Sequence, residues 1–526
     1  MKELKKLKIE ELSAEQKLGM MLCARRFTPD DMEFTLELIK DHALGCVQVP
    51  INAQTPEIIE KIKDAADYPL LIFNDMEQGY PRSDVPMLPA MTMAACNNKE
   101  YYHSFAKAVV ASAKKEGFSG TWCPVVDILR CDGPCRVQRI FGDTPEKVIF
   151  PAEEINEIFK EYGFIGTGKH YPGGEDCDFD THMAEGTSDV SKEEFIEYDL
   201  KPYIYLNNKG LLPAIMTRHA ICRKIDPEYP ATLSKPVIDM IREQGFDGVC
   251  FTDSLAMMGI LQKYGEENIL GMAAYAGNDI ILPNYRTSTK ECYEMFLKNY
   301  RDGMFSEERL NEAVRRVLNM MEFIADNAEK SVEITEKDRE NLENVAKDCI
   351  TAVTFDGAAA SLGDPEKRRL FVIVTEMGFK ADSPVAEIRT GKWYYPENIA
   401  AKIKEEFPNS EVKFIPEFAS AGENDAVLTA ATKHDEVVFV TFCTTTSYLG
   451  TDCLTRRTES VINCLILSGK VSAVLHFGNP AALKTIHHVP RRIFGYTAAA
   501  SQKYAIEVLA GKIPAKGTLP YDIKFE

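Results

Sequence analysis

The sequence predicts an α/β protein with an N-terminal (β/α)8 TIM-like barrel followed by a smaller α/β sandwich domain. A chain of 526 residues is too long for a single hydrophobic core. Short β-rich apolar stretches alternate with longer helical patterns up to about residue 330, as in repeated βα units around a parallel sheet. A second α/β alternation begins near residue 366. We therefore expect a barrel over 1–330, a linker and connecting helix over 331–365, and the sandwich over 366–526.

Eight stretches of the first part are the expected barrel strands. Each is short, apolar and bounded by polar or turn-forming residues. They lie at 18–23, 45–51, 70–75, 119–127, 163–169, 212–218, 247–252 and 278–283. Eight parallel strands that alternate with helices close into a barrel, and the C-terminal ends of all the strands open onto one face.

The second part has four expected strands, separated by helical patterns near 396–407, 455–468 and 500–510. These strands lie at 369–375, 411–415, 436–442 and 472–477. A charged helical segment over 333–353 precedes a Gly-, Ala- and Pro-containing stretch over 356–369, and we interpret this stretch as a connection.

Composition excludes several classes of partner. The formal net charge is −19, from 80 acidic and 61 basic residues, which argues against binding nucleic acid or an anionic membrane. The charged N-terminus lacks the apolar core of a signal peptide, and no run of eighteen apolar residues occurs. We expect a cytoplasmic monomer or homodimer with no cofactor. Its substrate should be a small molecule or an oligosaccharide that is neutral or weakly charged.

Polar side chains follow five of the expected barrel strands. A single polar residue at a strand end is most often a turn or helix cap. Five in succession, with two histidines among them, predict a site on the open face of the barrel. These strand ends are Asp75, Asp127, Lys169 with His170, His219 and Asp253.

An Asp-x-His pair, Asp180 and His182, lies in a polar stretch after the fifth strand. Such a pair is most often solvated or caps a turn, but the aspartate can also orient and charge the imidazole for proton transfer. The separate Asp253 ends an apolar run, where a nucleophile at a strand tip would lie.

Two other patterns carry less weight. Residues 163–169 match most of a phosphate-binding P-loop, but His170 replaces the required Ser or Thr and Pro172 obstructs the following helix. Cys131 and Cys135 have a spacing that would suit a metal, but no second Cys or His pair lies near them in the sequence. We therefore predict free thiols and no metal site.

As an ordered set, these motifs resemble the glycoside hydrolases of family three, specifically the β-N-acetylhexosaminidase branch, over nearly the full length. The matching segments are Asp75 to Gly79, Pro124 to Asp127, Arg139 to Gly142, Lys169 to Gly173, Asp180 to His182, Met216 to His219, Ala231 to Ser234, Gly245 to Met257 and Gly511 to Pro520.

The resemblance implies a retaining, exo-acting β-N-acetylhexosaminidase that releases terminal N-acetylglucosamine or a related amino sugar. Asp253 would attack the anomeric carbon and form a glycosyl-enzyme, with His182 as acid/base and Asp180 as its partner. The family's sugar-binding residues correspond to Asp75, Arg139, Lys169, His170 and His219.

The chain departs from the family pattern at Gly174 and Glu175, where the family has His-Gly, and in the cysteine-bearing stretch 131–135. The sugar and its aglycone are therefore open. A β-N-acetylglucosaminide phosphorylase is one alternative, because a histidine acid/base does not repel phosphate. A β-glucosidase or β-xylosidase is another, with Glu417 or Glu423 as acid/base. A non-catalytic sugar-binding relative is the third.

Overall fold

A computed structural model describes residues 4–130, 137–174, 180–375, 396–443, 447–448, 453–496 and 501–525. Contacts divide the chain into two compact units. The barrel unit comprises Met1–Ser83, Phe105–Cys131 and Thr144–Ile334, and the sandwich unit comprises Asp84–Ser104, Asp132–Asp143 and Thr335–Glu526. The domain limits expected at 330 and 365 stay predictions. Glu175, Cys131 and Cys135 lie outside the described residues.

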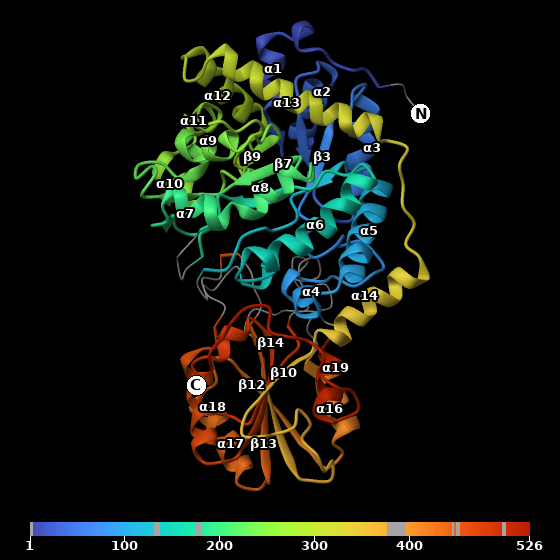
Figure 1. Ribbon diagram of the computed structural model, residues 1–526, viewed down its shortest axis with the longest axis vertical. Coiled ribbons are helices and arrows are strands. Elements are labelled where there is room, and N and C mark those ends of the chain that lie inside the picture. The colour runs from blue at the N-terminus through green and yellow to red at the C-terminus, as the bar shows by residue number, and fades with distance from the viewer. Residues whose placement is uncertain are drawn as a thin grey trace. The chain divides into compact units, whose positions relative to one another are not determined.

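The barrel unit contains a ring of short parallel strands (Figure 1). Two sheets, β1-β2-β3-β4 and β5-β7-β9, form most of the ring. Isolated parallel bridges join Gly120 to Ile165, Phe251 to Ile280, and Ile281 back to Leu22 beside β1. The strands are β1 (Cys23–Ala24), β2 (Cys46–Gln48), β3 (Leu71–Asn74), β4 (Gly120–Thr121), β5 (Gly168–Tyr171), β7 (Ala214–Thr217) and β9 (Val249–Thr252). The predicted TIM-like architecture is confirmed.

Four predicted barrel strands are wrong in extent. The strand expected over 163–169 is β5 (Gly168–Tyr171), and the stretch expected over 278–283 contains only the bridge residues Ile280 and Ile281. Within 18–23, residues up to Met20 belong to helix α1 (Ala14–Met20), which begins at a capping box made by Ser13 and Gln16. The strand expected over 119–127 ends at Thr121, and Pro124 soon follows, which has no backbone N–H for a sheet. A short parallel pair, β6 (Gly186–Ser188) with β8 (Ala220–Cys222), was not predicted.

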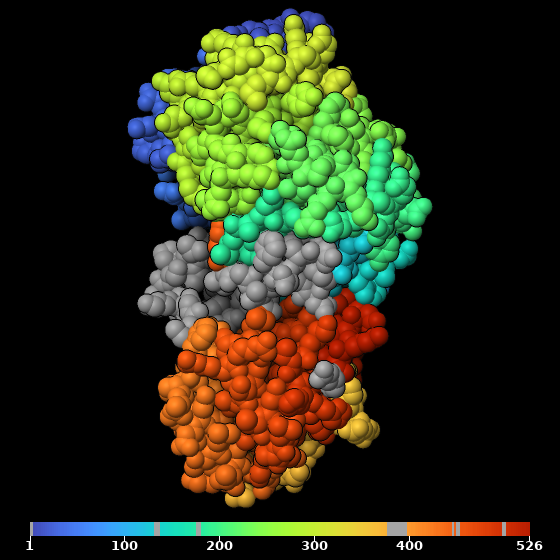
Figure 2. Space-filling model, turned by 90° about the vertical axis from the view of Figure 1, so that its left-hand side faces the viewer, coloured from blue at the N-terminus to red at the C-terminus, as the bar shows by residue number. Residues whose placement is uncertain are grey.

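Besides α1 and the single-turn α7 (Lys192–Glu194), ten helices of the described residues accompany these strands in the barrel region. At five of them, a Ser or Thr oxygen accepts a backbone N–H of the first turn, which fixes where the helix begins. Figure 2 shows a face on which later segments, coloured green to yellow, form most of the barrel unit's surface. The helices are α2 (Pro29–Lys40), α3 (Thr55–Ala65), α5 (Lys99–Glu116), α6 (Pro145–Glu161), α8 (Lys201–Asn208), α9 (Lys235–Glu243), α10 (Met258–Tyr264), α11 (Ile269–Ala276), α12 (Thr289–Arg301) and α13 (Glu307–Asp326).

Three aromatic rings pack inside the barrel. Phe73, Trp122 and Phe251 have ring centroids 5.3 to 6.1 Å apart, and all three are buried. Such large rings bury much apolar area and prefer tilted or edge-to-face contact. They fill the barrel at the level of β3 and β9, so the interior is a packed core rather than a channel.

The sandwich unit has a six-stranded sheet in the order β10-β15-β14-β13-β11-β12. β10 runs antiparallel to β15, and the other neighbours are parallel. The strands are β10 (Thr351–Thr354), β11 (Arg369–Thr375), β12 (Glu411–Pro416), β13 (Glu436–Cys443), β14 (Val471–Gly478) and β15 (Arg491–Phe494). All four predicted strands are present, while β10 and β15 were not predicted.

Helices cover both faces of this sheet, which confirms the α/β sandwich. In Figure 1, α16 (Pro396–Glu406) and α19 (Ser501–Leu509) lie on one side, and α17 (Ala421–Ala431) and α18 (Arg456–Leu467) lie on the other. Helix α14 (Glu336–Asp348) precedes β10. Within the described ranges, no helix is both long and apolar enough to cross a membrane.

Candidate active site

The Asp180–His182 pair lies between β5 and β6. The Nδ1 atom of His182 lies 2.7 Å from Oδ1 of Asp180, and the backbone N–H of His182 donates to the same oxygen at 2.9 Å. The Asp180 side chain is fully buried, whereas that of His182 is 20% exposed. Asp180 therefore caps the turn and also pairs with the imidazole. Because a carboxylate accepts, Nδ1 carries the hydrogen, and proton exchange would use Nε2.

The backbone of β9 and its neighbours fixes Asp253. Its N–H donates to the carbonyl of Thr217, the last residue of β7, at 2.9 Å. The N–H of Ser254 donates to Oδ1 of Asp253 at 2.6 Å. The carbonyl of His182 accepts the N–H of Met258 at 2.9 Å, which ties the dyad loop to the segment after Asp253.

Three histidines act electrostatically on Asp253. Burial by itself raises the pKa of this carboxyl group, but the charges of His170 and His219, the Ser254 N–H and the charge of His182 hold it below its ordinary value. The three imidazoles therefore favour the ionised form of the carboxylate. An ionised carboxylate is the form that a nucleophile requires.

Lys169 is a buried cation between two carboxylates. Its Nζ lies 2.5 Å from Oδ1 of Asp75 and 2.5 Å from Oε1 of Glu77. The Lys169 side chain is only 2% exposed, whereas that of Asp75 is 52% exposed. Lys169 thus holds Asp75 while leaving it open to a ligand. Charge-assisted bonds of this kind are suited to fixing sugar hydroxyl groups.

His170 and His219 both have protein partners. Nδ1 of His170 lies 2.7 Å from Oδ2 of Asp127, whose other oxygen accepts the His170 N–H at 3.0 Å. Nε2 of His219 lies 2.9 Å from the carbonyl of Ser254, so this nitrogen is a donor, and Nδ1 lies 2.8 Å from Oγ1 of Thr232. This bonding suits His219 to holding Ser254. Its sugar-binding role stays a prediction.

Arg139 belongs to the sandwich unit rather than the barrel unit. It ends the short helix Val137–Arg139, where the neighbouring Gln138 donates to the carbonyl of Cys443 at 2.5 Å. The described contacts bring Asp75, Lys169, His170, His182, His219 and Asp253 together within the barrel unit. The role predicted for Arg139 stays a prediction.

Sequence reasoning missed two residues of the site and one partnership. Arg25, directly after β1, donates to Ser254 and contributes charge near Asp253 and Asp75. Glu77 was part of a recognised motif but was not expected to bind Lys169. Asp127 was expected only as a strand end. The strand predicted over 18–23 stopped short of Arg25, so no sequence signal placed Arg25 at a strand end.

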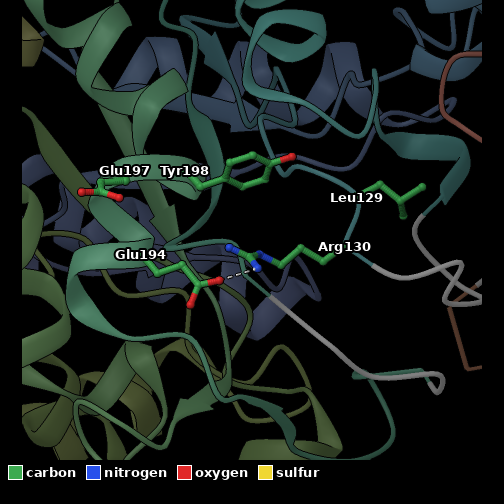
Figure 3. A pocket seen from close by; sticks show the side chains of 5 residues that line it. All are labelled: Leu129, Arg130, Glu194, Glu197 and Tyr198. Carbon is green, nitrogen blue, oxygen red and sulfur yellow. Dashed lines mark hydrogen bonds and ion pairs between the residues drawn. The ribbon is translucent and has the colours of Figure 1, made fainter.

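A cavity of about 480 Å³ lies between the segment that follows β4 and the helical segment 192–199, which follows β6 (Figure 3). Arg130 donates to both oxygens of Asp199 at 2.9 and 2.6 Å and to Glu194 at 3.1 Å. In Figure 3 the Glu194 carboxylate points toward Arg130, while that of Glu197 points away. The cavity is lined by Leu129, Arg130, Glu194, Glu197 and Tyr198.

Asp199, the partner of Arg130, lies near Asp127. A Cβ atom at Gly173 would lie 3.4 Å from Cβ of Asp199 and 3.9 Å from Oδ1 of Asp127, so the two aspartates flank this glycine. Since Asp199 neutralises Arg130, Glu194 and Glu197 leave the cavity acidic. A neutral or cationic group would be accommodated there more readily than an anion.

The matching family model and the similar proteins agree on one family. Residues 6–320 match the model described as the glycosyl hydrolase family 3 N terminal domain. The chain is 31% identical over 239 residues to a β-hexosaminidase of Idiomarina loihiensis, covering 44% of this chain and 71% of that protein. It is 25% identical over 328 residues to a β-N-acetylglucosaminidase/β-glucosidase of Cellulomonas fimi, covering 59% of this chain and 57% of that protein.

Two solved structures share the fold over nearly the whole chain. A glycoside hydrolase family 3 β-N-acetylglucosaminidase from a Paenibacillus species superposes with a TM-score of 0.82 at 24% identity, covering 97% of this chain and 99% of the other. A β-glucoside phosphorylase superposes with a TM-score of 0.80 at 21% identity, covering 98% and 95%. At these identities the likeness establishes the fold alone.

Proposed function

Because the chain belongs to glycosyl hydrolase family 3, we propose that it is a retaining, exo-acting β-N-acetylhexosaminidase. It removes terminal β-linked N-acetylglucosamine, or a related amino sugar, through a covalent glycosyl-enzyme. The observation that carries this proposal is the buried Asp180 bonded to His182, whose charge acts on Asp253. The β-hexosaminidase named among the relatives supports the choice of sugar.

In the first step, the ionised Asp253 attacks the anomeric carbon and the glycosidic bond breaks. The leaving oxygen takes the proton that His182 carries on Nε2. Asp180 stabilises the protonated ring through its 2.7 Å contact with Nδ1, and it fixes the direction in which Nε2 points. The histidines around Asp253 keep the carboxylate ionised until it attacks.

In the second step, His182 is neutral and Nε2 takes a proton from water. The water oxygen attacks the anomeric carbon, the bond to Asp253 breaks, and the carboxylate is regenerated. Two displacements at the same carbon retain its configuration. The proton taken from water restores His182 for the next cycle, so acid and base are the same residue.

Sugar recognition falls to the charged groups beside Asp253. Asp75 is held by Lys169 yet half-exposed, so its carboxylate can accept from sugar hydroxyl groups. His170 is oriented by Asp127 and contributes a second polar contact. We include Arg139 and His219 in the proposed binding set on the strength of the family motif.

The β-glucosidase or β-xylosidase alternative requires a glutamate acid from the second domain. Glu423 accepts from the N–H and Oγ of Ser420, each at 2.7 Å, and so caps helix α17. These bonds lower the pKa of Glu423 below its ordinary value, whereas a general acid needs a raised pKa. This observation disfavours Glu423 as the acid, and the same alternative would leave the buried Asp180–His182 pair without a role.

One assay tests the proposal against its alternatives. The purified protein is given the nitrophenyl β-glycosides of N-acetylglucosamine, N-acetylgalactosamine, glucose and xylose, each with and without inorganic phosphate. We expect release from the N-acetylamino sugars, with free sugar as product in both buffers. A sugar 1-phosphate would identify a phosphorylase, a preference for glucose or xylose would contradict the sugar assignment, and no turnover would favour a non-catalytic relative.

The cytoplasmic location and the monomeric or homodimeric state expected from the sequence stay predictions. Cell fractionation tests the first and light scattering of the purified protein tests the second.

A further inference from the structure

Arg25 joins the ends of three barrel strands, β1, β2 and β9, to the segment after the bridge residues Ile280 and Ile281. It follows β1 directly and donates from Nε to Oε1 of Gln48, in β2, at 2.5 Å. Its Nη1 donates to Oγ of Ser254 at 2.6 Å and to the carbonyl of Pro283 at 2.8 Å. Ser254 follows Asp253 at the end of β9. Pro283 lies two residues after Ile281, whose bridge to Leu22 closes the ring of strands. The guanidinium therefore fixes Ser254 relative to the rest of the barrel.

Ser254 is held on both sides. Arg25 bonds its side chain, while Nε2 of His219 donates to its carbonyl at 2.9 Å. Its own N–H donates to Oδ1 of Asp253 at 2.6 Å. The peptide that follows Asp253 cannot rotate without breaking one of these bonds. The direction of the Asp253 carboxylate thus depends on Arg25 through one intervening residue.

The charge of Arg25 also reaches the carboxylates. Burial lowers the pKa of Arg25 below its ordinary value, while the charges of Asp253 and Asp75 raise it. A guanidinium keeps its charge under these conditions, and its planar donors are fixed by their bonds. A fixed cation near Asp253 favours the ionised carboxylate, which is both the attacking group of the first step and the group released in the second.

A purely structural role is the competing interpretation. The guanidinium carbon lies 5.3 Å from the ring centroid of Tyr285, and this contact also stabilises the rim of the barrel. If Arg25 had only this structural role, its removal would lower the stability of the folded protein without a selective effect on either chemical step.

We propose that Arg25 is a positioning residue for the nucleophile, which acts on Asp253 through Ser254 and through its own fixed charge. The proposal rests on the proposed function of Asp253. It adds a barrel strand, β1, to the set that builds the catalytic geometry.

The first experiment replaces Arg25 and measures kcat and KM separately. We expect Arg25→Ala to lower kcat about 10²-fold while KM changes little, because a small misplacement of a reacting group has a cost of this size. Millimolar guanidinium should restore part of kcat in Arg25→Ala, and Arg25→Lys should retain more activity than Ala. An unchanged kcat in a folded Arg25→Ala protein would overturn the proposal, as would loss of stability with no rescue.

Arg26→Ala is the matched control. Arg26 is the next residue, but it pairs with Asp31 at 2.9 Å and donates to the carbonyl of Arg286 at 3.0 Å, with no bond to Ser254. It should lower kcat far less than Arg25→Ala. Equal losses in the two variants would indicate a general effect of removing charge from this segment.

A pH profile and a double mutant separate the effect of the Arg25 charge from the effect transmitted through Ser254. Removing the Arg25 charge raises the pKa of Asp253, so the acid limb of kcat/KM should move to higher pH in Arg25→Ala. If Arg25 positions Asp253 through Ser254, the two substitutions are not independent. The fold-decrease in kcat of the Arg25→Ala/Ser254→Ala double variant should then be smaller than the product of the fold-decreases of the two single variants. The proposal would be contradicted if the two fold-decreases in kcat multiplied in the double variant and the acid limb of the kcat/KM profile stayed at the same pH.

Trapping the glycosyl-enzyme with a fluorinated sugar tests the role of Arg25 separately from the assignment of Asp253 as the nucleophile. In the wild-type protein the label should reach Asp253, and in Arg25→Ala it should reach the same residue more slowly. A wild-type label elsewhere would overturn the proposed function, whereas equal labelling rates in both proteins would overturn the role of Arg25 alone.

Discussion

One oxygen of Asp180 accepts from both the side chain and the backbone of His182, at 2.7 and 2.9 Å. Because the Asp180 side chain is fully buried, its charge is screened by the imidazole rather than by water. The same oxygen therefore caps the turn and pairs with the imidazole. The acid/base role of this pair stays a prediction.

Replacing Asp180 with Asn tests this dual role. The amide retains the shape of the cap but not the negative charge that stabilises the protonated imidazole. We expect kcat to fall about 10-fold to 10²-fold, with little change in KM and with the alkaline limb of the rate profile at lower pH. A large rise in KM with an unmoved profile would make Asp180 a binding residue.

His182→Gly should affect substrates in proportion to their need for a proton. A sugar leaving group requires protonation, whereas an activated dinitrophenolate does not. We expect a loss of about 10²-fold or more for natural disaccharides and a much smaller loss for the activated phenol in the glycosylation step. Pre-steady-state measurement of phenol release isolates that step. Equal losses for both substrates would argue that His182 is structural.

Lys169→Met removes the cation between Asp75 and Glu77. The two carboxylates then lose the charge that holds them, and Asp75 moves from its sugar-binding position. We expect KM to rise about 10-fold or more, because a charge-assisted contact is lost. Lys192→Met is the control, since Lys192 pairs with Glu243 at the surface. A kcat effect with KM unchanged would contradict a binding role.

Glu423→Gln tests the alternative acid. Since the carboxylate caps helix α17, we expect a small decrease in thermal midpoint and unchanged kcat/KM on every leaving group. A large selective loss for poor leaving groups would restore Glu423 as the acid/base and remove that role from His182.

The fold class was predictable because hydrophobic periodicity reports which faces are buried. The strands of the sandwich were found nearly to the residue, since long buried runs such as β13 and β14 have no competing pattern. The barrel strands are only two to four residues long, so capping at Ser13 and the proline at 124 decided their limits. Local bonds of this kind leave little trace in periodicity.

Residues of the candidate site could be predicted where a charged or imidazole side chain lies at the C-terminal end of a strand. Asp75, His219 and Asp253 follow strands, and Lys169 and His170 lie within β5; parallel strands bring their C-terminal ends together. Arg25 was missed because its strand has two residues and the apolar pattern before it belongs to a helix. The partners of Lys169 and His170 were missed as pairs because they are 43 to 94 residues distant in sequence.

Labelling with a 2-deoxy-2-fluoro or 5-fluoro glycoside, followed by mass spectrometry of the peptides, tests whether Asp253 is the nucleophile. We expect a single covalent label on Asp253, within the peptide from Gly248 to Met257. Asp253→Ala should give no label and should lower kcat on the order of 10³-fold or more. A label on any other carboxylate, or full turnover by Asp253→Ala, would show that Asp253 is not the nucleophile.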